Sequence, residues 1–206
     1  MKIRRKVSYL IITMFIMALV LVGCGTNTIT VADDIEETEE YRTIDHFELK
    51  DNLGSEREDI GYCSILIPNE YVPSEDEPGM YVSSIYPIDS SNINYTVASP
   101  GKPGYVADDL SMEDYKDTIE EAMSSVGKKI DLIIDSFEKT ELEGVPCFKI
   151  RSHYEIGDVS VEQLTYLVLS RQTHIITYTQ MSDDGLMVDF ENAEGTIRLV
   201  REKSQS

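Results

Sequence analysis

The C-terminal half of the chain contains a series of β-strand patterns whose connecting turns are too short for a crossover. The runs are rich in β-branched and aromatic residues and cover 130–140, 145–154, 159–170 and 173–180. The turns between them fall at Glu143-Gly144, Gly157-Asp158 and Arg171-Gln172. Consecutive strands joined by such turns pair antiparallel, because a parallel pair needs a connection of roughly a dozen residues or more. The sequence therefore predicts an antiparallel sheet and excludes a doubly wound parallel one.

Further strands are predicted upstream of this region. Residues 61–68 are expected to form a strand that ends at a proline, and the period of two places Cys63, Ile65 and Ile67 on one face. Residues 80–88 and 92–99 are expected to form a hairpin. Residues 69–79, which are rich in proline and acids, are expected to form a loop.

A first helix is predicted to begin after Ser111. The Ser111 hydroxyl can cap the first turn, and Asp114 completes a capping-box pattern. Gly127 is well suited to the left-handed residue that ends a helix. The apolar residues that share one face of this helix are Met112, Tyr115, Ile119, Met123 and Val126.

A second helix is predicted after the acidic cap Ser182-Asp183-Asp184. Its apolar residues, spaced at 4, 3, 4 and 3, are Leu186, Phe190, Ala193, Ile197 and Val200. Gly195 within it costs roughly 1 kcal/mol relative to alanine. We expect the apolar repeat to outweigh this cost.

The predicted order of elements corresponds to an α+β fold with a single antiparallel β-sheet and helices packed on it. Between residues 60 and 200 the chain resembles the PsbP-like superfamily of the PsbP/DcrB type. The resemblance is carried by segments 62–68 (YCSILIP), 136–146 (SFEKTELEGVP) and 178–180 (YTQ). It implies an α/β/α sandwich and a docking or accessory role, and it brings no set of catalytic residues.

The N-terminus resembles a bacterial lipoprotein signal. A basic segment precedes an uncharged run over residues 9–22, and the run ends in the lipobox Leu21-Val22-Gly23-Cys24. The run is shorter than the roughly 20 residues that a membrane-spanning helix needs. By this resemblance, Cys24 becomes the first residue of the mature protein and carries diacylglycerol and palmitate. A retained short transmembrane helix is the alternative.

This signal predicts the organisation and location of the chain. We expect a signal peptide over residues 1–23, an acidic flexible linker over 24–58, the α+β domain over 59–202 and a disordered tail over 203–206. The acylated Cys24 would attach the domain to the lipid bilayer, on the extracytoplasmic face of the cell membrane.

The charge of the chain excludes some classes of partner. Four of the 18 Lys and Arg residues and none of the 38 Asp and Glu residues lie in the signal, so its removal would change the net charge from −20 to −24. Nucleic-acid binding needs basic residues that neutralise phosphates, and an anionic membrane surface repels acidic segments. We expect no nucleic acid as a partner, and attachment to the membrane by lipid alone.

Cysteine and histidine residues give no definite site. Cys63 and Cys147 can form a disulfide in an exported chain, or they can be two unpaired core residues, since free cysteine is among the most buried residue types. His46, His153 and His174 have no metal-ligand spacing, although the last two could approach each other if their strands are adjacent.

No hydrolase elbow, phosphate-binding loop or other catalytic motif is present in the sequence. We therefore expect no enzyme activity, no metal and no cofactor. The leading hypothesis is a protein-interaction or accessory module of the cell envelope, with an envelope protein as partner. The alternative is a small-ligand or cation-binding lipoprotein associated with a transporter.

Overall fold

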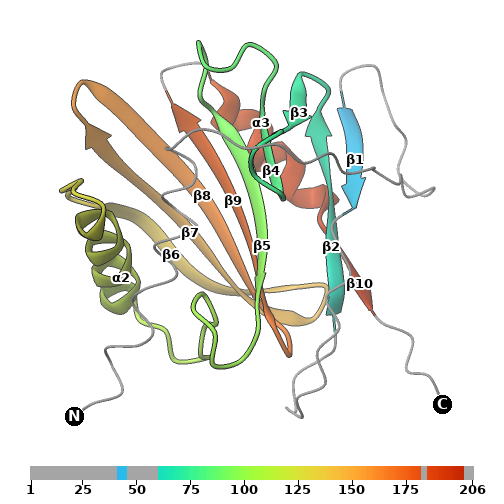
Figure 1. The fold of residues 1–206 in the computed structure, drawn as a ribbon. Helices are drawn as coiled ribbons and strands as arrows, with labels where there is room; N and C mark the ends of the chain where they lie inside the picture. Colours follow the sequence, from blue (N-terminus) through green and yellow to red (C-terminus); the bar gives the residue numbers. More distant parts are fainter. Residues whose placement is uncertain (1–40, 46–59, 182–184, 202–206) are drawn as a thin grey trace.

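The computed structural model describes residues 41–45, 60–181 and 185–201, and its strands form two antiparallel sheets (Figure 1). The larger sheet has seven strands in the order β3-β4-β5-β9-β8-β7-β6. The bounds are Tyr71–Pro73 (β3), Met80–Ser83 (β4), Asn92–Ala98 (β5), Ile133–Leu142 (β6), Val145–Ile156 (β7), Val159–Leu169 (β8) and Thr173–Met181 (β9). The antiparallel pairing predicted for the C-terminal half is confirmed, since β6, β7, β8 and β9 pair in succession.

The second sheet has three strands and was not expected. Its order is β1-β2-β10, with bounds Tyr41–Asp45, Ile60–Pro68 and Arg198–Arg201. The prediction of a single sheet is therefore wrong in this detail, while the α+β class is confirmed. Strand β2 pairs along both edges, and its buried Cys63, Ile65 and Ile67 share a core cluster with residues of the larger sheet. β1 falls inside the segment predicted as a linker.

The C-terminal segment differs most from its prediction. Helix α3 covers only Leu186–Ala193, and a 3-10 turn over Glu194–Thr196 leads into β10. The helical repeat thus ends just before Gly195, where a helix is least favourable. Beyond it, β10 gains backbone hydrogen bonds by pairing with β2, and Leu199, not Val200, is buried.

The start of α3 is stabilised by a residue of the preceding strand. Gly185 precedes the helix with φ of +77° and provides no side-chain cap. The buried Met187 N–H instead donates to Oε1 of Gln180 at 2.6 Å. The predicted cap residues 182–184, like the signal, Cys24, His46 and the tail, lie outside the described residues.

Helix α2, over Met112–Ser125, forms as predicted. The Asp114 N–H donates to Oγ of Ser111 at 3.1 Å, and the Ser111 hydroxyl donates to Oδ2 of Asp114 at 2.7 Å. At the other end, Gly127 has φ of +78° and donates to the Ser124 carbonyl. Residues next to the helix are sufficient to define both of its ends, Ser111 through its side chain and Gly127 through its backbone conformation.

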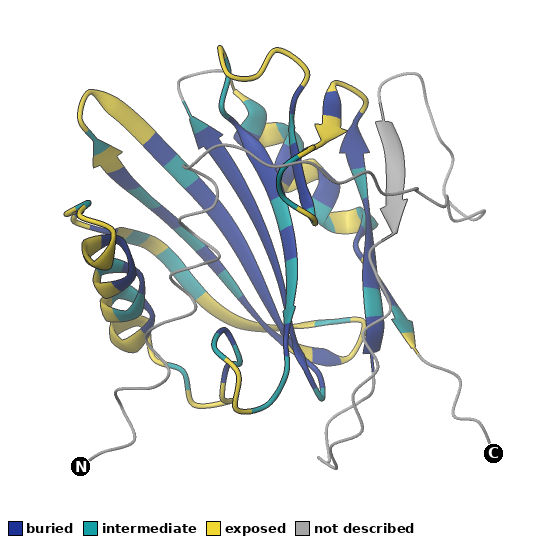
Figure 2. Cartoon of the chain, in the orientation of Figure 1, coloured by how far each residue is buried: buried dark blue, intermediate teal, exposed yellow. Residues whose placement is uncertain are grey.

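Two core clusters cover the two faces of the larger sheet (Figures 1 and 2). One contains α2, and the other contains α3, β2 and β10. In the second cluster, Phe190 of α3 lies 4.9 Å from the ring centroid of Tyr178 and 5.8 Å from that of Tyr71. Among the described residues, no helix is both long and apolar enough to cross a membrane.

Candidate binding site

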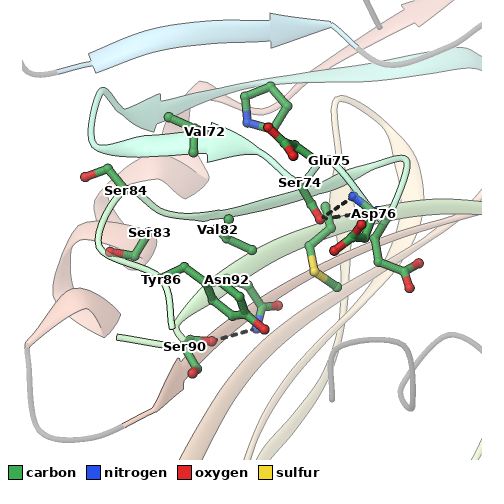
Figure 3. A pocket seen from close by; sticks show the side chains of 13 residues that line it. Val72, Ser74, Glu75, Asp76, Val82, Ser83, Ser84, Tyr86, Ser90 and Asn92 are labelled. Atoms are coloured by element: carbon green, nitrogen blue, oxygen red, sulfur yellow. Dashed lines mark hydrogen bonds between the residues drawn. The ribbon is translucent and has the colours of Figure 1, made fainter. Parts of the chain in front are cut away.

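A pocket of about 290 Å³ lies at the β3–β5 end of the larger sheet (Figure 3). Strand pairing places Val72 of β3 opposite Val82 of β4, and Val82 opposite Asn92 of β5, so these three side chains share one face. The loops 74–79 and 84–91 supply the other walls. The remaining lining residues are Pro73, Ser74, Glu75, Asp76, Glu77, Met80, Ser83, Ser84, Tyr86 and Ser90.

Hydrogen bonds fix the backbone of the acidic loop of the pocket. Oγ of Ser74 accepts hydrogen bonds from the N–H groups of Asp76 and Glu77, at 3.3 and 3.2 Å. Gly79 approaches β5 closely, because the Tyr95 N–H donates to its carbonyl at 2.8 Å. Its φ is +83°, and a Cβ at this position would lie 2.4 Å from the Tyr95 carbonyl oxygen. Only glycine fits here without displacing the backbone.

The second loop, 84–91, exposes apolar side chains. Ile85, Tyr86 and Ile88 are 57%, 43% and 89% exposed, and they adjoin the pocket because Tyr86 lines it. The base of the loop is closed by a hydrogen bond from the Ser83 N–H to the Ser91 carbonyl. The predicted hairpin over residues 80–99 is therefore correct in its pairing, but its first strand ends at Ser83.

The pocket carries negative charge on Glu75, Asp76 and Glu77. Burial raises the pKa of Glu77 above its ordinary value, and the neighbouring Asp76 charge raises it further. Within the described part of the chain, neither Glu75 nor Glu77 forms an ion pair with a basic side chain. A cation placed here would relieve the repulsion between the carboxylates.

Residue types that can act as nucleophiles or as acids and bases lie elsewhere, in the core on the other face of β5. The Cys63 N–H donates to the Tyr95 hydroxyl at 3.0 Å, and this hydroxyl lies 2.7 Å from Nδ1 of His174. The hydroxyl accepts from the Cys63 N–H, and it can donate its own proton to Nδ1 when the imidazole carries its proton on Nε2. Burial lowers the pKa of His174 to about 4, partly opposed by a backbone hydrogen bond with Ile60.

Cys63 and Cys147 are free thiols, each 1% exposed, in the same core cluster. Burial raises the pKa of both to about 12. They are therefore protonated at neutral pH, whereas a nucleophilic or metal-binding cysteine must be a thiolate. The structure describes them as the unpaired core residues that the sequence left as one alternative.

The histidines are not brought together. His153 of β7 pairs with Glu162 of β8 in the strand register, whereas His174 of β9 pairs with Val168. Nδ1 of His153 instead contacts Oδ2 of Asp135 at 2.9 Å, at a partly exposed site. Across the described ranges, no three His, Cys, Asp or Glu residues are grouped so that they could hold a metal ion.

Sequence reasoning missed the pocket. The one local signal was Pro87, since a proline within an apparent strand argues against that strand. The exposure of Ile85 and Ile88 has no such signal, because a short run of apolar residues is also typical of a buried strand.

Two solved structures are similar to the chain. One is the solution structure of cyanobacterial PsbP (CyanoP) from Synechocystis sp. PCC 6803, which is 10% identical, covers 82% of this chain and 98% of that chain, and gives a TM-score of 0.47. The other is the crystal structure of LpqN, involved in cell envelope biogenesis of Mycobacterium tuberculosis. It is 10% identical, the match covers 78% of this chain and 91% of that chain, and the TM-score is 0.41. These similarities assign no ligand, partner or activity to this chain.

No protein-family model matches the chain, and neither does the sequence of any curated protein.

Proposed function

We propose that the chain is a lipid-anchored extracytoplasmic protein whose domain binds a partner protein of the cell envelope and has no catalytic role. The observation that carries the proposal is the exposed apolar loop 84–91 beside the pocket. Ile85, Tyr86 and Ile88 adjoin one another in the chain and expose large apolar side chains. Covering apolar surface stabilises a complex by roughly 25 cal/mol per Å², although ordering costs offset part of this.

The loop has the properties of a prepared contact surface. Its ends are joined by the Ser83–Ser91 hydrogen bond, and the Met181 N–H donates to Oγ of Ser91 at 3.0 Å. The apolar side chains are therefore presented on a scaffold that is tied to both β4 and β9. Binding and catalytic residues are found disproportionately on loops held in this way by a rigid sheet.

The non-catalytic part of the proposal is supported by the location of the reactive residue types. Cys63, Cys147 and His174 are buried, and this burial shifts the pKa of each further toward the neutral form at pH 7. The accessible pocket is lined by carboxylates, hydroxyls and apolar groups instead.

Site-specific photocrosslinking tests the proposed contact. A photoreactive residue is introduced into the full chain in its native cells, at Ile88 in one sample and at Val159 in the other. Val159 is the matched control, because it is also an exposed apolar residue but lies at the β7–β8 turn. We expect position 88 to capture one defined envelope protein in repeated experiments, and position 159 not to capture it. Identical products at both positions, or no reproducible product at position 88, would overturn the proposal.

The anchor is tested separately by Cys24→Ala. We expect this variant to lose palmitate labelling and to leave the membrane fraction. Cys63→Ala and Cys147→Ala are the controls and should keep both properties. Membrane retention of Cys24→Ala would mean that residues 9–22 are a retained transmembrane segment.

A further inference from the structure

We infer that the pocket binds a lysine or arginine side chain of the partner, while apolar residues of the same partner segment pack against loop 84–91. The inference rests on the proposed function, because it names the chemistry of the segment that would occupy that site. Size, lining, charge and rigidity each favour this occupant.

The size of the pocket favours one side chain. Its volume of about 290 Å³ lies just below the roughly 300–1,000 Å³ typical of pockets for whole small molecules. A long side chain inserted from a protein segment needs less room than a small molecule that binds alone. The remaining contact area would then come from the apolar loop outside the pocket.

The lining matches the two parts of a basic side chain. Lysine and arginine have an apolar stem that packs on apolar surface and a cationic head that stays near polar groups. Val72, Met80, Val82 and Tyr86 offer apolar contact for the stem. The acids of loop 74–79 offer carboxylates for the head.

The charge of the site selects a basic side chain over a bare metal ion. Glu75 and Glu77 have no ion pair within the described ranges, yet these ranges contain no arrangement of acids that could hold a metal ion. A guanidinium or ammonium group needs only hydrogen-bond contact with one or two carboxylates. The net charge, −20 for the full chain and −24 without residues 1–23, would also steer a basic segment toward the domain.

The backbone that carries the acids is held in place before binding. Oγ of Ser74 accepts from the backbone N–H groups of Asp76 and Glu77, and the Ser74 N–H donates to the Met80 carbonyl at 2.8 Å. The close approach of Gly79 to Tyr95 fixes the end of the loop on β5. Such pre-organisation reduces the entropy lost on binding and so increases affinity.

Peptide titration of the full chain tests the inference. The probes are the capped pentapeptide Leu-Val-Lys-Leu-Val and its matched version with norleucine in place of lysine, followed by NMR of the backbone amides. We expect the lysine peptide to shift the amides of Glu77, Val82 and Tyr86 at about tenfold lower concentration, because a hydrogen bond to a charged group contributes about 1.5 kcal/mol. Equal potency of the two peptides at these amides, or no shift of them by either peptide, would overturn the inference.

A charge-matched pair of variants identifies the acids responsible. Glu75→Gln/Glu77→Gln should abolish the preference for lysine over norleucine. Glu113→Gln/Asp117→Asn removes the same charge from α2 and should retain the preference. Loss of the preference in both double variants would show that general charge, and not the pocket, selects lysine.

The two proposals fail in different ways. Capture of a partner at position 88 together with equal binding of the two peptides would reject the basic side chain and keep the interaction module. Selective binding of the lysine peptide without capture of any partner would keep the pocket chemistry and reject the proposed function.

Discussion

Strand β5 separates two regions of opposite chemistry. On one face, Tyr95 joins Cys63 and His174 in a dry core, where the reactive groups are neutral. On the other, Asn92 lines a pocket whose acids are accessible. Both residues belong to a single seven-residue strand, and the period of two places their side chains on opposite faces. Cys63, Tyr95 and His174 therefore lie on the buried face of this strand, and the accessible face carries the pocket.

The comparison shows that residue type alone does not identify a site. A thiol or an imidazole acts through its charged form or through a lone pair that a substrate can reach, and burial removes both. A carboxylate beside water keeps its charge. If this contrast is correct, groups on the core face of β5 are unreactive, and groups on the pocket face are accessible.

The largest expected effect is on thiol reactivity. At a given pH, a pKa raised from 9.0 to about 12 lowers the thiolate fraction of Cys63 and Cys147 about a thousandfold. In a Cys24→Ser chain, we expect iodoacetamide at pH 8 to alkylate neither residue on the time scale of free cysteine. Unfolding in urea should restore rapid alkylation of both. Rapid modification of either thiol in the folded protein would show that the core is open to solvent.

The next largest effect is on the pH dependence of stability. The pKa of His174 is lowered from 6.5 to about 4, so the unfolded state binds more protons between these values. The stability contributed by neutral His174 is complete above pH 6.5 and is lost as the pH falls toward 4, by about 3 kcal/mol. His174→Asn keeps an acceptor near Tyr95 but cannot titrate.

Urea unfolding at pH 7 and pH 4 measures this contribution. Between pH 7 and pH 4, the unfolding free energy of the wild type should fall by about 3 kcal/mol more than that of His174→Asn. Since both chains carry the same carboxylates, their difference isolates the histidine. Equal losses in the two proteins would mean that His174 is hydrated.

A smaller effect is expected where the pocket loop meets β5. Gly79→Ala places a methyl group 2.4 Å from the Tyr95 carbonyl oxygen and also requires a positive φ. We expect a loss of roughly 2–3 kcal/mol in unfolding free energy. Gly127→Ala is the matched control, because its φ is also positive but no atom lies within 4 Å of the added carbon. It should cost about 1 kcal/mol, and equal costs would mean that the loop is not fixed against β5.

The parts of the fold that depend on neighbouring residues could be predicted from the sequence. The Ser111 cap, Gly127, the turn at Glu143-Gly144 and the alternation of Cys63, Ile65 and Ile67 are local patterns, and each corresponds to a feature of the structure. Glu143 has φ of +47° and Gly144 has φ of +84°, which suits a two-residue hairpin turn.

The parts that depend on distant residues could not be predicted. Arg198 is paired with Ser64, which is far away in the sequence. The C-terminal segment therefore forms a strand because it pairs with β2, although its local apolar spacing favours a helix. The pocket likewise depends on a distant contact, since the Ser84 N–H donates to the Glu70 carbonyl and brings loop 84–91 beside β3. No local pattern encodes either pairing.

The smallest expected effect on stability is at Ile88, and it sharpens the comparison most. This side chain is 89% exposed, so Ile88→Ser should change the unfolding free energy by no more than about 0.5 kcal/mol. Ile65→Val, which removes one methyl group from a side chain that is 2% exposed, should cost about 0.5–1.5 kcal/mol.

Partner binding should show the reverse order. If loop 84–91 is a contact surface, Ile88→Ser weakens co-purification of the crosslinked partner, whereas Ile65→Val leaves it unchanged. Ile88→Ser would then reduce binding but not stability, and Ile65→Val would reduce stability but not binding. A general loss of folded protein cannot produce this pattern. Parallel effects of the two variants on stability and binding would mean that the exposed loop is only another part of the fold.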